Sequence, residues 1–112
     1  MKEIKFLEEY TGKDFPKVFT KKVSGITNVY VPYVISEDEN GYKYTYLMVG
    51  PGKFNYEDLV DKIIGLKYSA ADMFAVINNY LLDPNNDKYL TEYLEMQDHR
   101  KHAKEYAKRF FN

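Results

Sequence analysis

Two histidines, His99 and His102, come nearest in type and spacing to residues that could bind a metal. Glu95 precedes His99 by four residues and Asp98 precedes His102 by four, and on a helix such pairs share one face, as ligands of a divalent metal would. The order matches no zinc motif, and acid–histidine pairs at this spacing are also ordinary helix-surface interactions. We therefore expect no metal, no other cofactor, no catalytic residue and no enzyme, with a small metal-dependent enzyme as a lower-ranked alternative.

Other patterns typical of catalytic or nucleotide-binding sites are incomplete. The segment 50–53 (GPGK) lies between an expected strand and an expected helix, as phosphate loops do, but Phe54 follows the lysine where Ser or Thr would be needed. The serines Ser24, Ser36 and Ser69 do not lie in the strand–turn–helix context of a nucleophile elbow. These segments are better interpreted as turns, a strand position and a helix cap.

The last helical segment ends in a basic cluster that could contact phosphates, next to aromatic residues that could stack on bases. Cations are also favoured in the last turns of any helix by its dipole, and the net charge of −1 argues against broad electrostatic binding. A nucleic-acid-binding or regulatory module is therefore our alternative reading. The basic patch consists of Arg100, Lys101, Lys104, Lys108 and Arg109.

The elements that must position these residues run from strands to helices, which predicts an α+β fold. With 112 residues and 45% hydrophobic composition, the chain has the size and balance of one globular domain. We expect a single domain over 1–112, with strands in about 2–50 and helices in about 55–111. The predicted order is a three- to four-stranded antiparallel meander, two short helices and one long C-terminal helix.

Two dipeptides predict the hairpins of the meander. Asn-Gly at 40–41 suits a type I′ turn, and Ser-Gly at 24–25 suits another. Pro32 cannot donate to a central strand, so we expect a bulge there or an early end to one pairing. A further strand is expected within 2–9. The predicted partners are Glu37 with Tyr44, Ile35 with Tyr46, Tyr33 with Met48, Asp38 with Lys43, Ser36 with Thr45, Val34 with Leu47, Val23 with Ile26, and Phe19 with Tyr30.

Capping residues and apolar spacing predict the helices. Asn55 and Ser69 are the expected N-caps of two short helices, and a turn at 83–86 precedes a long helix over about 87–110. The first helix is expected to bury Leu59, Val60, Ile63, Ile64 and Leu66, and the second to face inward with Met73, Phe74, Ile77, Tyr80 and Leu81.

The terminal helix carries a heptad-like seam that Arg100 interrupts once. A helix of this length spans roughly 35 Å, which is long beside the radius of gyration of about 13 Å expected for a compact domain of this size. We therefore predict that the seam contacts a protein partner or a second copy of the chain. The partner-contact candidates are Tyr89, Tyr93, Met96, Ala103, Ala107 and Phe110.

Several segments resemble a group of short proteins from prophages and mobile elements of gut bacteria: 10–16 (YTGKDFP), 33–35 (YVI), 67–69 (KYS), 75–81 (AVINNYL) and 92–97 (EYLEMQ). The final helix is similar to the closing helix of some phage tail-assembly accessory proteins. The resemblance implies a phage-related accessory or assembly role through protein contacts. The absence of Cys, of a signal peptide and of a long apolar stretch leads us to expect a cytoplasmic protein that does not enter a membrane.

Overall fold

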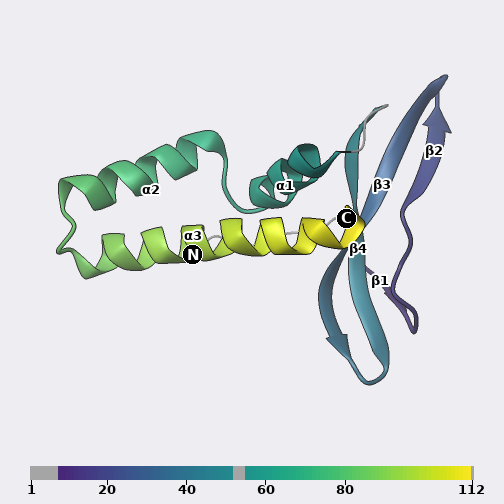
Figure 1. Cartoon of the computed structure of the whole chain (residues 1–112), viewed down its shortest axis with the longest axis horizontal. Helices are drawn as coiled ribbons and strands as arrows, with labels where there is room; N and C mark the ends of the chain where they lie inside the picture. Colours follow the sequence, from purple (N-terminus) through teal and green to yellow (C-terminus); the bar gives the residue numbers. More distant parts are fainter. Residues whose placement is uncertain (1–7, 52–54, 112) are drawn as a thin grey trace. The chain divides into compact units, whose positions relative to one another are not determined.

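The computed structural model describes residues 8–51 and 55–111 of the 112-residue chain (Figure 1). A four-stranded antiparallel sheet precedes three helices, so the predicted α+β class is confirmed. Residue contacts group the chain into two compact units, and the chain passes from one unit to the other between Asp58 and Leu59. The single-domain organisation expected from the sequence stays a prediction.

The sheet consists of β1 (Tyr10–Gly12), β2 (Phe19–Val23), β3 (Ile26–Asp38) and β4 (Gly41–Pro51), in the order β1-β4-β3-β2. The last three form the predicted meander, and β1 adds a fourth strand along the free edge of β4. Of the strand expected within 2–9, residues 2–7 lie outside the described part of the chain. The described strand β1 begins just after that range.

The hairpin between β2 and β3 has the predicted turn and register. Ser24 and Gly25 both have positive φ, 52° and 79°, as a type I′ turn requires. Val23 therefore lies opposite Ile26 and Phe19 opposite Tyr30. The pairing of β2 ends there, before it reaches Pro32, so the expected early end is also confirmed.

The predicted register between β3 and β4 is wrong. The turn occupies Glu39 and Asn40 instead of 40–41, and Glu37 lies opposite Tyr42. The Asp38 carboxylate accepts a hydrogen bond from the Asn40 backbone at 2.8 Å, which closes the turn. A register shift between Ser36 and Val34 then displaces the pairs from Val34 to Tyr30 by one more residue, and a second shift beyond Tyr30 leaves Asn28 opposite Pro51. The other observed partners are Asp38 with Gly41, Ser36 with Lys43, Val34 with Tyr44, Tyr33 with Thr45, Pro32 with Tyr46, Val31 with Leu47, and Tyr30 with Met48.

Gly41 has a role other than the predicted type I′ turn. Its φ is 135°, and a Cβ at this position would overlap the Gly12 carbonyl, because β1 runs directly alongside. Glycine is therefore needed at 41 for the close approach of another strand. From the sequence alone, an Asn-Gly pair that forms a type I′ turn looks the same as one whose glycine allows another strand to approach closely.

The first helix, α1 (Tyr56–Gly65), begins with the predicted cap. Asn55 and Asp58 exchange two hydrogen bonds, with the Asp58 backbone donating to Asn55 Oδ1 at 2.8 Å and Asn55 Nδ2 donating to Asp58 Oδ2 at 2.9 Å. Its expected apolar face is buried at Leu59, Val60, Ile63 and Ile64. Leu66, which follows the helix, is half-buried.

The second helix, α2 (Ala70–Leu82), has the predicted N-cap, Ser69, but not the predicted burial. Ser69 and Asp72 form a reciprocal capping box. No residue of α2 is buried, and Phe74 and Leu81 are each 67% exposed, so their predicted inward orientation is wrong. The apolar spacing identified the helix correctly, but burial also requires a second layer over the apolar face.

The last helix, α3 (Asp87–Ala107), continues into a 3₁₀ turn, η1 (Lys108–Phe110). Asn86 caps it by accepting from the backbones of Lys88 and Tyr89 at 3.0 and 3.2 Å. In Figure 1, α2 runs back alongside the first half of α3. Stacked rings of Tyr80 and Tyr93, with centroids 4.4 Å apart, join the two helices.

Candidate functional site

The structure divides the predicted partner-contact seam into buried and accessible positions. Met96, Ala103 and Ala107 are 0% exposed within the single chain, so a partner cannot reach them in this structure. Tyr89, Tyr93 and Phe110 are half-buried. Three of the six predicted partner-contact residues therefore lie where the chain itself covers α3.

His99 lies in the interior instead of on the surface. Its side chain is 8% exposed, Nε2 is 3.0 Å from the carbonyl oxygen of Ile63, and the Tyr68 ring centroid is 5.7 Å away. His102, one turn further on, is exposed, with its ring centroid 6.4 Å from that of His99. Within residues 8–51 and 55–111, no group of three or more His, Asp or Glu side chains is placed to hold a metal ion.

Burial lowers the pKa of His99 below the usual 6.5, and the positive charges of Lys67 and His102 lower it further. The Ile63 carbonyl acts in the opposite direction, because it favours the protonated ring. Since the folded-state pKa is depressed, the unfolded chain binds the proton more readily. His99 therefore contributes stability above about pH 6.5, and this contribution is lost as the pH falls from there through the folded-state pKa.

The basic patch is placed together at the C-terminal end of α3 and in η1. Lys101, Lys104, Lys108 and Arg109 are exposed, and Arg100 is half-buried. The guanidinium of Arg109 lies 5.6 Å from the ring centroid of Tyr106. Tyr106 itself is 7% exposed, so its ring face is not open for a nucleic-acid base to stack on.

An open groove of about 710 Å³ runs between α2 and α3, and sequence analysis did not predict it. Tyr68, Ala75 and Val76 contribute apolar surface to it. Its charged lining consists of four carboxylates and one ammonium group, and the charges of Glu95 and Glu92 help burial to raise the pKa of Tyr68. The charged residues are Asp72, Asp87, Lys88, Glu92 and Glu95.

The same two helices expose large apolar side chains. Leu82 is 84% exposed and Leu94 is 56% exposed, in addition to Phe74 and Leu81. Adjacent residues of a helix point about 100° apart and residues seven apart nearly coincide, so Phe74, Leu81 and Leu82 lie within about 100° of one another around α2 and one partner can cover all three. The adjacent Leu81 and Leu82 were a signal in the sequence of a wide apolar stripe on α2.

One face of the sheet carries an aromatic cluster that sequence analysis did not predict as a unit. Phe19 contacts Tyr30 and Tyr46 at ring-centroid distances of 4.9 and 4.7 Å, and Tyr44 contacts Tyr46 at 5.5 Å. Tyr10 adds a ring from β1, 5.8 Å from that of Tyr44. Only the register shift in β3 places these rings on one face. The rings pack against one another and stay partly exposed, so they form an aromatic cluster on the surface of the sheet.

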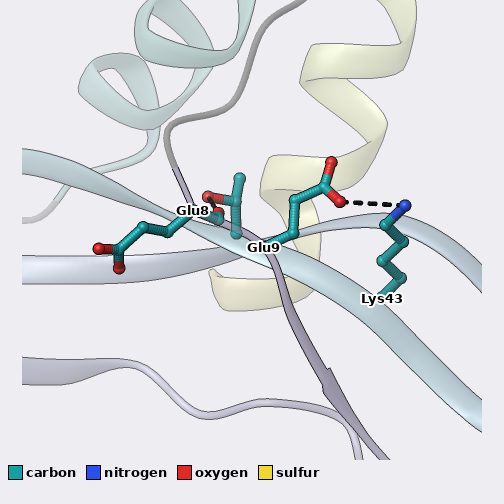
Figure 2. A network of polar contacts seen from close by, with 4 residues as sticks. Glu8, Glu9 and Lys43 are labelled. Carbon is teal, nitrogen blue, oxygen red and sulfur yellow. Dashed lines mark hydrogen bonds and ion pairs between the residues drawn. The ribbon is translucent and has the colours of Figure 1, made fainter.

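The segment before β1 is fixed to β4 by polar contacts. The Thr45 hydroxyl donates to the Glu8 carbonyl at 2.6 Å, and Figure 2 shows Glu9 reaching Lys43, with 3.0 Å between Oε2 and Nζ. The Tyr10 hydroxyl donates to the Glu8 carboxylate, and this bond is the main cause of the raised pKa of Tyr10. These contacts hold the end of β1 in place and bring together no catalytic pair.

Comparison with protein-family models, with curated proteins and with solved structures finds no match to this chain. Among the helices described here, none combines the length and the apolar character needed to cross a membrane.

Proposed function

We propose that this chain is a non-enzymatic accessory or assembly protein that acts by binding another protein through its α2–α3 surface. The observation that carries the proposal is the exposure of Phe74, Leu81 and Leu82, between 67 and 84%, on a helix without any buried residue. Fully burying one such side chain is favourable by about 1.5–3 kcal/mol. A partner covering all three would gain binding energy from side chains that contribute little to the fold.

The surroundings of the ionisable groups support a binding role over a catalytic one. His99, whose pKa is shifted, is directed at a backbone carbonyl and does not line the α2–α3 groove. A general base would have to reach substrate in a cleft. The resemblance to small prophage proteins also favours an assembly role. The cysteine-free sequence favours a location in the cytoplasm.

Position-specific photo-crosslinking tests the proposal. A photoreactive amino acid replaces Phe74 or Leu82 in the full chain expressed in its own cells, and Lys62, exposed on α1, serves as the matched control position. We expect a discrete crosslinked protein, including a second copy of this chain, from 74 and 82 but not from 62. Equal crosslinking from all three positions, or none from any, would contradict the proposal.

The basic patch supports nucleic-acid binding as a second candidate function, because four of its five cationic side chains are exposed at one end of α3. Phosphate contacts must weaken steeply as salt rises. A gel-shift titration at two salt concentrations, with Lys101→Glu and Lys104→Glu as the loss-of-charge variant, tests it. Binding that neither salt nor these substitutions weaken would exclude this candidate.

A further inference from the structure

The α2–α3 groove has the features of a docking site for a basic, partly apolar segment. Val76 and Tyr68 give it an apolar surface, and its charged lining amounts to three net negative charges, from four carboxylates and Lys88. Glu92 and Glu95 are half-buried, and both raise the pKa of Tyr68 through their charge. Their carboxylates therefore contribute negative potential to the groove.

A segment with the complementary chemistry lies at the other end of the same helix. Lys101, Lys104 and Lys108 are exposed along the C-terminal part of α3 and in η1, with Arg109 beside them and half-buried Phe110 next in the chain. Glu92 and Lys104 are twelve residues apart on α3, or roughly 18 Å along its axis. The groove of one chain therefore cannot bind its own basic end while α3 remains a continuous helix.

We propose that the groove binds the basic end of α3 from a second copy of this chain. Two copies related by a two-fold axis make the contact twice, because the groove of each receives the basic end of the other. Opposite charges then meet at both contacts, and the apolar surface of each groove is covered. This inference rests on the proposed function and names a second copy as the partner of the groove, whose lining does not include Phe74, Leu81 or Leu82.

Charge reversal tests the inference on the full chain. The groove variant carries Glu92→Lys and Glu95→Lys, and the end variant carries Lys101→Glu and Lys104→Glu. Sedimentation velocity measures the dimer fraction, and circular dichroism checks that each variant stays helical. Reversal of two exposed charges on α1, Asp61→Lys and Lys62→Glu, is the matched control.

We expect each variant alone to associate more weakly than the wild type, and the two variants mixed together to associate again. The groove variant gives the groove lining one net positive charge, and the end variant leaves the segment formed by residues 101, 104, 108 and 109 with no net charge. Each variant alone therefore loses the charge attraction at both contacts, and we expect its dimer dissociation constant to rise at least tenfold over the wild type, while the control is unchanged. Mixed in equal amounts, they place opposite charges at one contact again and should form a heterodimer. The wild-type dimer should also weaken as salt rises, because exposed charge pairs are screened.

A wild type that stays monomeric at high concentration would overturn the inference, as would a dimer that neither variant weakens or a mixture that does not re-form one. If the chain stayed monomeric and its groove instead bound a separate lysine-rich helical peptide, the partner of the groove would be a different protein and not a second copy. Crosslinking from Phe74 and Leu82 to a different protein would then still support the proposed function, so the two failures are distinguishable.

Discussion

The contrast between Met96 and Leu82 gives the sharpest test of which apolar residues hold the fold and which are left for a partner. Met96 on α3 is 0% exposed and Leu82 at the end of α2 is 84% exposed. Removing a fully buried methionine side chain costs about 2–5 kcal/mol. Leu82 keeps only a sixth of its surface covered, so its truncation should cost about 0.3–0.5 kcal/mol if full burial is taken as about 1.5–3 kcal/mol.

Urea unfolding of Met96→Ala and Leu82→Ala, followed by far-ultraviolet circular dichroism, measures both values. The protein should be dilute enough to prevent association, since a bound partner would add to the apparent stability. We expect the free energy of unfolding to fall by at least 2 kcal/mol for Met96→Ala and by less than about 1 kcal/mol for Leu82→Ala. Equal losses, or a larger loss at Leu82, would refute the assignment of Met96 to the core and Leu82 to a contact surface.

Three further substitutions test local features. Gly41→Ala should destabilise the chain by about 1–3 kcal/mol and expose β1 to faster amide exchange, because its Cβ meets the Gly12 carbonyl at a positive φ; unchanged exchange would contradict this. His99→Gln keeps a donor near the Ile63 carbonyl but cannot titrate, so the wild type should lose stability from about pH 6.5 downward while the variant does so less; parallel pH profiles would argue against a buried, neutral His99. Ser69→Ala should cost about 1 kcal/mol through loss of the capping box, measured by thermal unfolding, and no loss would mean that α2 does not need this cap.

The sequence was informative where a local interaction decides the structure. Ser69 and Asn55 cap helices as predicted, and the Ser24–Gly25 turn set its hairpin register, because each depends on residues within a few positions. Gly41 was misread because its role depends on Gly12, which is distant in the sequence. Local patterns therefore predicted the elements better than their register.

Burial was harder to predict than helix position. The seam of α3 and the stripe of α2 have the same apolar spacing, yet Ala103 is 0% exposed and Phe74 is 67% exposed. Spacing shows which side chains share a face, and only tertiary packing decides whether that face is covered. The α2–α3 groove escaped prediction for the same reason, since residues from two helices and from the segment before α2 line it.

Hydroxyl-radical footprinting of the α2 side chains tests the central claim most directly, by comparing the dilute purified chain with the chain inside the cells that produce it. A partner surface predicts strong labelling of Phe74, Leu81 and Leu82 in the purified chain and clear protection of all three in cells. Labelling that is equally strong in both settings would show that this apolar surface stays open to water while the protein works, and would contradict the claim.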